Sequence, residues 1–152
     1  MRARRLPRLV RAALAAVAGA ALALLLAACD GDDSTANCLT GLTTACAPLY
    51  PPTFDNVYTR TLAPTCAQPG AQCHGTAGVQ GGLYFTTADD AFALLLGEVD
   101  GRPRVLPGDP SCSLLIERIF SPNPAQVMPP KSPLAAGESC AIIQWINGGA
   151  KR

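Results

Sequence analysis

Apolar residues recur at helical spacing in four short stretches of the chain, all of them after residue 52. The first stretch predicts a helix that Thr53 caps and that Pro64 ends, because proline lacks the amide hydrogen that a helix interior needs. One face of this helix carries Phe54, Val57, Tyr58 and Leu62. We therefore expect it to pack against the core of a folded domain.

Two further helices are predicted from their start signals. Thr87, with Asp90 three residues later, predicts a capped helix that continues through the apolar run AFALLL and stops at Gly97. Asp109 and Pro110 fit the cap and the first position of the next helix, which continues through SCSLLIERIF.

The stretch GESCAIIQWINGGA predicts the fourth helix, which Gly148 and Gly149 end. Its expected inward face carries Ala141, Ile142, Trp145 and Ile146. Before it, five prolines in the thirteen residues SPNPAQVMPPKSP exclude a helix or a central strand, so Met128 is expected on a stiff, extended loop. No continuous strand pattern competes, and we predict an all-α domain of about four short helices with long Pro/Gly-rich loops over residues 53–152.

The N-terminal residues 1–28 differ from the rest of the chain. Five arginines and no acidic residue precede an apolar run that ends in Leu26-Ala27-Ala28-Cys29. A basic start before an apolar run is typical of an export signal, and its end resembles the site at which bacterial lipoproteins are cleaved. We therefore predict a lipoprotein signal peptide over residues 1–28, with a diacylglycerol on the thiol of Cys29; the alternative is an uncleaved anchor helix.

Residues 29–52 are rich in Asp, Thr, Gly and Pro and show no apolar period, which predicts a flexible tether. Without residues 1–28, seven basic residues stand against eleven acidic ones, a net charge of about −4. A domain of this charge has no basic surface for nucleic acid.

Seven cysteines are many for a chain of 152 residues, and export makes them intelligible because thiols outside the cytoplasm tend to be oxidised or ligated. Six remain once Cys29 is assigned to the lipid, and six cysteines allow fifteen pairings. Cys38 and Cys46 are close enough in sequence to form a local disulfide. Cys112 and Cys140 lie near the starts of the third and fourth helices, where a disulfide would hold the loop that carries Met128.

The stretch CAQPGAQCHGTAG, from Cys66 to Gly78, holds the only histidine of the chain. A Cys-His pair with a second cysteine upstream is typical of covalent haem attachment, although two residues usually separate the cysteines and six do so here. The extra residues Gln68 to Ala71 fit a type II turn, which would form a stiff excursion from the attachment site. The alternative for Cys66 and Cys73 is a disulfide that closes a small ring.

Several motifs occur in an order that resembles the cytochrome c-like lipoprotein domains of planctomycete and myxobacterial type. They are CHG at Cys73–Gly75, GGL at Gly81–Leu83, VLPGDPSCSLL at Val105–Leu115, MPP at Met128–Pro130 and WINGGA at Trp145–Ala150. The resemblance implies one covalent haem c, with thioethers from Cys66 and Cys73 and with His74 and Met128 as the iron ligands. It also implies that Trp145 packs the C-terminal helix where it crosses the first one.

The resemblance implies an electron carrier and not an enzyme, with a redox partner protein in the bacterial envelope and a membrane anchor through Cys29. The domain would face the periplasm or the exterior. Arg102 and Arg104 could pair with the haem carboxylates, although two arginines in a loop are more often solvated. The second hypothesis is a haem-free helical lipoprotein with a binding or structural role, in which Cys66–Cys73, Cys112–Cys140 and Cys38–Cys46 are disulfides.

Overall fold

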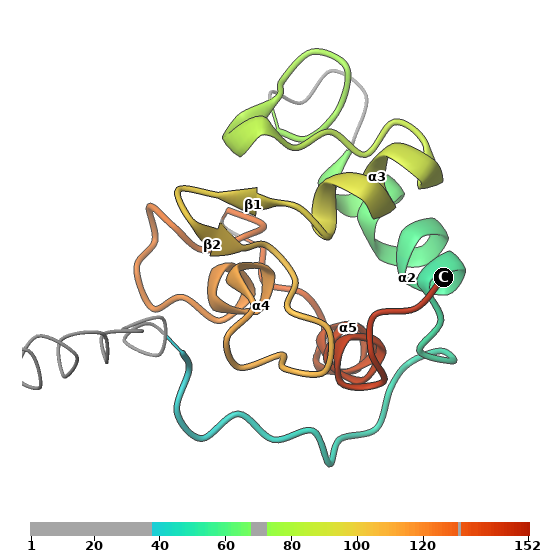
Figure 1. Cartoon of the computed structure of the whole chain (residues 1–152), viewed down its shortest axis with the longest axis vertical. Helices are drawn as coiled ribbons and strands as arrows, with labels where there is room; N and C mark the ends of the chain where they lie inside the picture. Colours follow the sequence, from blue (N-terminus) through green and yellow to red (C-terminus); the bar gives the residue numbers. More distant parts are fainter. Residues whose placement is uncertain (1–37, 68–72, 131) are drawn as a thin grey trace, which may run out of the picture. The chain divides into compact units, whose positions relative to one another are not determined.

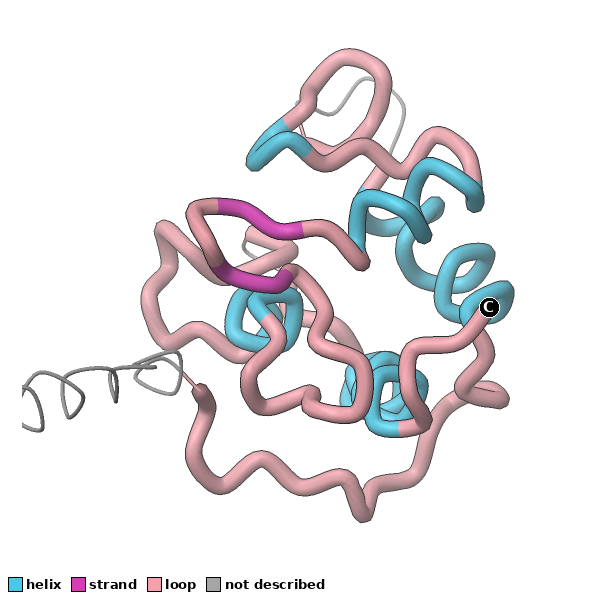
Figure 2. Tube along the Cα trace, in the orientation of Figure 1, coloured by secondary structure: helices cyan, strands magenta, loops and turns pink. Residues whose placement is uncertain are grey.

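A computed structural model describes residues 38–67, 73–130 and 132–152, all of which belong to the same structural unit. Short helices and one small hairpin are joined by long loops (Figures 1 and 2). The prediction of a mostly helical fold is confirmed, but the prediction that it is purely all-α is wrong. The hairpin consists of strands β1 (Glu98–Val99) and β2 (Arg102–Pro103), which pair antiparallel.

The hairpin turns at Asp100 and Gly101, which both have a positive φ, 51° and 74°. Asp-Gly is a pair that favours the two-residue turns with positive φ at both positions, because glycine and aspartate tolerate this conformation best. The Asp100-Gly101 dipeptide therefore indicates a hairpin turn in the sequence. The flanking strands are too short to show an alternating pattern of apolar and polar residues.

The first helix begins as expected but does not end at Pro64. Thr53 caps α2 (Phe54–Val57) by accepting a hydrogen bond from the amide of Asn56. The chain then continues as a π-helix, η2 (Tyr58–Cys66), which contains Pro64. The wider turn of a π-helix accommodates the proline ring that a regular α-helix excludes. As a result, Cys66 is the last residue of this helix.

Helix α3 (Ala88–Leu95) confirms its predicted start. The Thr87 hydroxyl accepts from the Asp90 amide at 3.1 Å and donates to the Asp90 carboxylate at 2.7 Å. A short 3-10 turn, η3 (Gln80–Gly82), precedes this helix in the chain. The cap was predictable because both of its partners lie within one turn of each other in sequence.

Helix α4 (Leu114–Ile119) begins later than predicted, because Asp109 does not cap it. The Asp109 carboxylate accepts from the amide of Cys112 at 3.1 Å, and the Ser113 hydroxyl donates to the Asp109 carbonyl at 2.8 Å. These bonds close a turn in front of the helix. Aspartate stabilises turns and helix starts through the same side-chain acceptor, so the sequence pattern fits both.

Helix α5 (Ala136–Asn147) is the longest helix among the described residues and confirms the predicted inward face. Trp145 is 3% exposed, and its ring centroid lies 5.4 Å from that of Phe54 in α2. The predicted packing of Trp145 between the last and the first helix is therefore confirmed. A single core joins the helices, with Phe54, Leu95, Ile116 and Ile142 each 1% exposed or less.

Residues 38–52, the described part of the expected tether, lie along this unit as an extended segment, which we call the strap (Figure 1). Two disulfides hold the strap, Cys38–Cys112 and Cys46–Cys140. The predicted pairs Cys38–Cys46 and Cys112–Cys140 are therefore wrong. Tyr50, a residue of the strap, is 5% exposed and belongs to the core cluster of the domain. The boundary expected at residue 53 therefore does not separate the strap from the domain.

Several predictions lie outside the described residues. These are the signal peptide over residues 1–28, the lipidated Cys29 and the turn at Gln68 to Ala71. Within the described residues, no helix has both the length and the apolar character needed to cross a membrane.

Candidate haem-binding cavity

The structure brings the four predicted site residues together around one cavity of about 410 Å³. Cys66 comes from the end of η2, Cys73 and His74 come from the segment that begins at residue 73, and Met128 comes from the proline-rich loop. These segments are far apart in sequence. The cavity volume lies in the range of sites that bind small molecules and cofactors.

The two cysteines stand next to each other despite the six residues between them. The amide of His74 donates to the carbonyl of Cys66 at 3.2 Å, so the chain returns to the point at which it left the helix. With two intervening residues the histidine would follow the first cysteine by four positions, and the same pair of atoms would make an ordinary helical hydrogen bond. The extra residues therefore leave intact the backbone contact that joins the ends of the motif.

Both thiols of the motif are free, whereas the other four described cysteines form disulfides. The structure thus lacks the Cys66–Cys73 disulfide that the second hypothesis requires. Burial, with smaller contributions from the neighbouring Cys73 and from Glu138, raises the pKa of the Cys66 thiol to about 12. Cys66 therefore keeps its proton at neutral pH.

His74 is oriented by two contacts. Its Nδ1 lies 3.3 Å from the carbonyl of Leu83, and because a carbonyl can only accept, Nδ1 carries the hydrogen. The ring also packs against Phe85, with the centroids 5.3 Å apart. This tautomer leaves Nε2 with a free lone pair, the form of imidazole that binds a metal ion.

Burial lowers the pKa of His74, and hydrogen bonds to the backbone of Leu83 and Gln80 only partly oppose this effect. A buried imidazole is harder to protonate because its charged form loses hydration. At neutral pH the ring is therefore uncharged and available as a ligand.

We expect the single histidine resonance of the haem-free protein to titrate below the usual value of about 6.5, as measured by NMR, and to return to it in urea. Since the unfolded chain then binds more protons in this range, the free energy of unfolding should fall as the pH falls through the interval between the two pKa values and stay level above it. Equal midpoints in the folded and unfolded chains would contradict the assigned burial.

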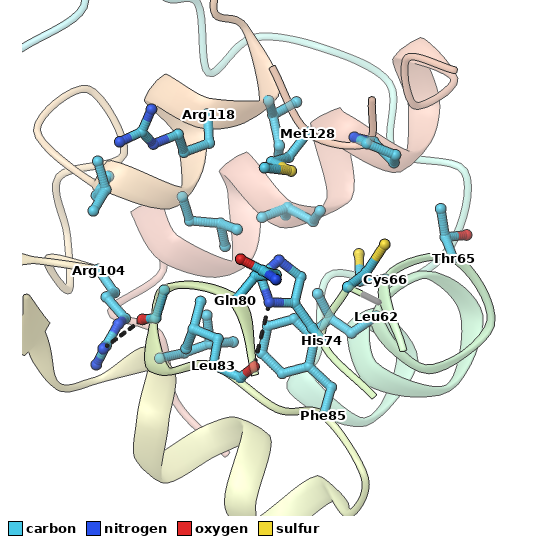
Figure 3. Close-up of a pocket in the computed structure, with 18 of the residues that line it drawn as sticks. Leu62, Thr65, Cys66, His74, Gln80, Leu83, Phe85, Arg104, Arg118 and Met128 are labelled. Atoms are coloured by element: carbon cyan, nitrogen blue, oxygen red, sulfur yellow. Dashed lines mark hydrogen bonds between the residues drawn. The ribbon is translucent and has the colours of Figure 1, made fainter. Parts of the chain in front are cut away.

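Met128 is anchored by its backbone. Its amide donates to the carbonyl of Arg118 in the last turn of α4 at 2.8 Å, and the bond to Pro129 is cis. In the view of Figure 3 its side chain lies above the ring of His74, and both line the cavity. The predicted loop position is confirmed, and a thioether and an imidazole are the two ligands that the sequence resemblance assigned to iron.

The rest of the wall is mainly apolar, with leucines, Phe85 and Ile142, but three arginines also reach it. Arg102 is paired with Glu117, and Arg104 is bound to backbone carbonyls. Arg118 was not predicted as a site residue and carries no sequence signal, because its position on an amphipathic helix is equally typical of a solvated residue. In Figure 3, Arg104 and Arg118 lie on the side of the cavity away from Cys66.

The donor set fits a haem better than a metal ion held by protein groups alone. In the part of the chain that the structure describes, no cluster of three or more His, Cys, Asp and Glu side chains is placed to hold a metal ion. One imidazole and one thioether instead suit an iron whose other four ligands belong to a porphyrin. Two free thiols at one end and cationic groups at the other fit the vinyl and carboxylate substituents of that ring.

The fold and the cavity together define a small helical domain with two disulfides and one mainly apolar cavity. Residues 71–132 match the family model described as planctomycete cytochrome C, which confirms the resemblance found in the motifs. The matched segment contains Cys73, His74 and Met128, whereas Cys66 and α5 lie outside it. No match was found among curated proteins or among solved structures.

Proposed function

We propose that this protein is an exported, lipid-anchored c-type cytochrome that binds one haem covalently and carries single electrons without catalysing a reaction of its own. The observation that supports this most strongly is the convergence of Cys66, Cys73, His74 and Met128 on one cavity. A bound haem would supply an iron that takes up and releases one electron.

The residues of the chain would hold the haem in three ways. Each thiol of Cys66 and Cys73 would add across one vinyl group, the sulfur bonding one carbon and the hydrogen the other, so that neither partner is oxidised. His74 and Met128 would bind the iron through Nε2 and Sδ. The apolar wall would exclude water, which together with the thioether ligand raises the reduction potential relative to two nitrogen ligands.

The location follows from the N-terminal sequence. An export signal over residues 1–28 and a diacylglycerol on Cys29 would hold the domain at a membrane of the bacterial envelope, facing the periplasm or the exterior. Its partners would be a redox protein of the envelope and the membrane itself, and its net charge of about −4 disfavours nucleic acid. The two disulfides suit an oxidising compartment.

The haem-free alternative has less support. Its three expected disulfides differ from the two observed pairs, and the thiols of Cys66 and Cys73, which it joins, are free in the structure. A visible spectrum of the protein exported from a host with a cytochrome c maturation system separates the two. The proposal predicts a sharp reduced α-band and a one-electron reductive titration. A colourless protein would contradict it.

Replacing Met128 with alanine should abolish the absorption band from sulfur bound to ferric iron and lower the reduction potential, because a thioether ligand favours ferrous iron and is lost. The haem stain that survives denaturation should remain, since Met128 takes no part in attachment. Val127→Ala, one residue earlier on the same loop, is the matched control and should keep the band. Retention of the band in Met128→Ala would exclude Met128 as the ligand.

A further inference from the structure

The guanidinium of Arg104 is held at the wall of the cavity by neutral groups only. Nη1 donates to the carbonyl of Leu94 at 3.2 Å, and Nη2 donates to the carbonyl of Gly81 at 3.1 Å. Nε is buried and has no hydrogen-bond partner among the described residues. A guanidinium has five N–H donors, so Nε–H and at least one further N–H remain available on a side chain that lines the cavity.

No carboxylate neutralises this cation in the described part of the chain. The ion pairs there are Arg102–Glu117 and Arg152–Asp89. Asp100 also lines the cavity but forms no ion pair with Arg104. The Arg104 side chain is half-buried, but its Nε is fully buried, and a buried donor without an acceptor costs free energy. The missing partner is therefore expected to come from whatever fills the cavity.

The surroundings of Arg104 are shaped to hold its head group. A Cβ atom on Gly97 would lie 3.3 Å from Nη1, and one on Gly82 would lie 3.3 Å from Nη2, so both positions favour glycine. The backbone is fixed as well, because the Arg104 amide donates to Gly97 at 3.0 Å and the Leu115 amide donates to Arg104 at 2.9 Å. The planar fork is thus preorganised, which lowers the entropy lost when it binds an anion.

We propose that Arg104 binds a carboxylate of the group in the cavity through Nε–H and a free Nη–H, at the end opposite the two thiols. The inference rests on the proposed function, under which the carboxylate is a haem propionate. Arg118, whose side chain has no partner among the described residues, supplies a second positive charge on the same side (Figure 3). Arg102 takes no part, since Glu117 already neutralises it.

The test compares haemin with its dimethyl ester, in which both carboxylates are replaced by uncharged methyl esters. Both are titrated into the full chain carrying Cys66→Ser and Cys73→Ser, so that binding is reversible and visible by absorbance. Hydrogen bonds to charged groups predict that haemin binds about 10- to 100-fold more tightly than the diester. Arg104→Gln should sharply reduce this ratio, leaving only the smaller contribution of Arg118, and Arg104→Lys should restore part of the loss.

Arg60→Gln is the matched control, because Arg60 is exposed, lies over the ring of Tyr50 and does not line the cavity. It should leave the ratio unchanged. Equal affinity for haemin and its diester with Arg104 intact, or a preference of unchanged size in Arg104→Gln, would overturn this inference alone. Binding of neither compound would overturn the proposed function and the inference with it. The comparison of haemin with its diester uses protein with Arg104 intact, so it tests the inference even if Arg104→Gln does not fold.

Discussion

Replacing both Cys66 and Cys73 with serine is expected to abolish the haem stain that survives denaturing electrophoresis. Serine keeps the size of the side chain but cannot form a thioether, so the loss should be complete. The folded double variant should still bind haem reversibly, because His74 and Met128 remain on the cavity wall. The measurement is the stain before and after denaturation, on protein exported from a host with a maturation system.

Cys29→Ser is the control for this experiment, because it removes one thiol of the N-terminal sequence and should leave the stain intact while preventing lipidation. A double variant that retained the stain would show that haem is attached elsewhere. A single variant at Cys73 is expected to weaken the stain, since only one thioether can then form.

Replacing Cys46 and Cys140 with alanine is expected to lower the free energy of unfolding by about 2–5 kcal/mol. The disulfide closes a loop with a sequence separation of 94, and long loops lose most entropy on cross-linking. It also attaches the strap to α5, where Cys140 is 2% exposed. Urea unfolding of the haem-free protein, followed by far-ultraviolet circular dichroism, measures the change.

The double variant at Cys38 and Cys112 is the matched comparison, since its loop has a separation of 74 and should give a loss of similar size. Disulfide mapping by mass spectrometry checks the pairing independently. Recovery of a Cys38–Cys46 peptide, or unchanged stability in both double variants, would contradict the observed connectivity.

The parts of the fold that could be predicted depend on contacts between residues close in sequence. Thr53 and Thr87 each cap a helix through an amide three residues later, and α5 shows its buried face as a regular apolar stripe. These signals are complete within one or two helical turns. Met128 was also assigned correctly to a loop, because its neighbouring prolines exclude regular structure whatever the rest of the chain does.

The parts that could not be predicted depend on the tertiary fold. The strap has no apolar period, and only the positions of Cys112 and Cys140 in space show where its cysteines pair. Asp109 carries a side-chain acceptor that serves a turn and a helix cap equally well. Pro64 was expected to end a helix because the switch to a π-helix, which tolerates it, has no sequence signature.

The candidate site was predictable in composition but not in shape. The motif around His74 and the prolines around Met128 identified the residues, and the structure places them on one cavity wall. The unusual spacing between Cys66 and Cys73 could not be judged from sequence, because it depends on the hydrogen bond from His74 to Cys66 that brings the ends together. The unpaired nitrogen of Arg104 was likewise visible only in three dimensions.

The mass of the exported protein under denaturing conditions tests the central claim, that one haem is bound to this cavity through two thioethers. The account predicts a mass larger than that of the processed chain by one haem, carried after digestion by a peptide that contains Cys66, Cys73 and His74. The mass of the processed chain alone, with the two cysteines free or joined to each other, would contradict it.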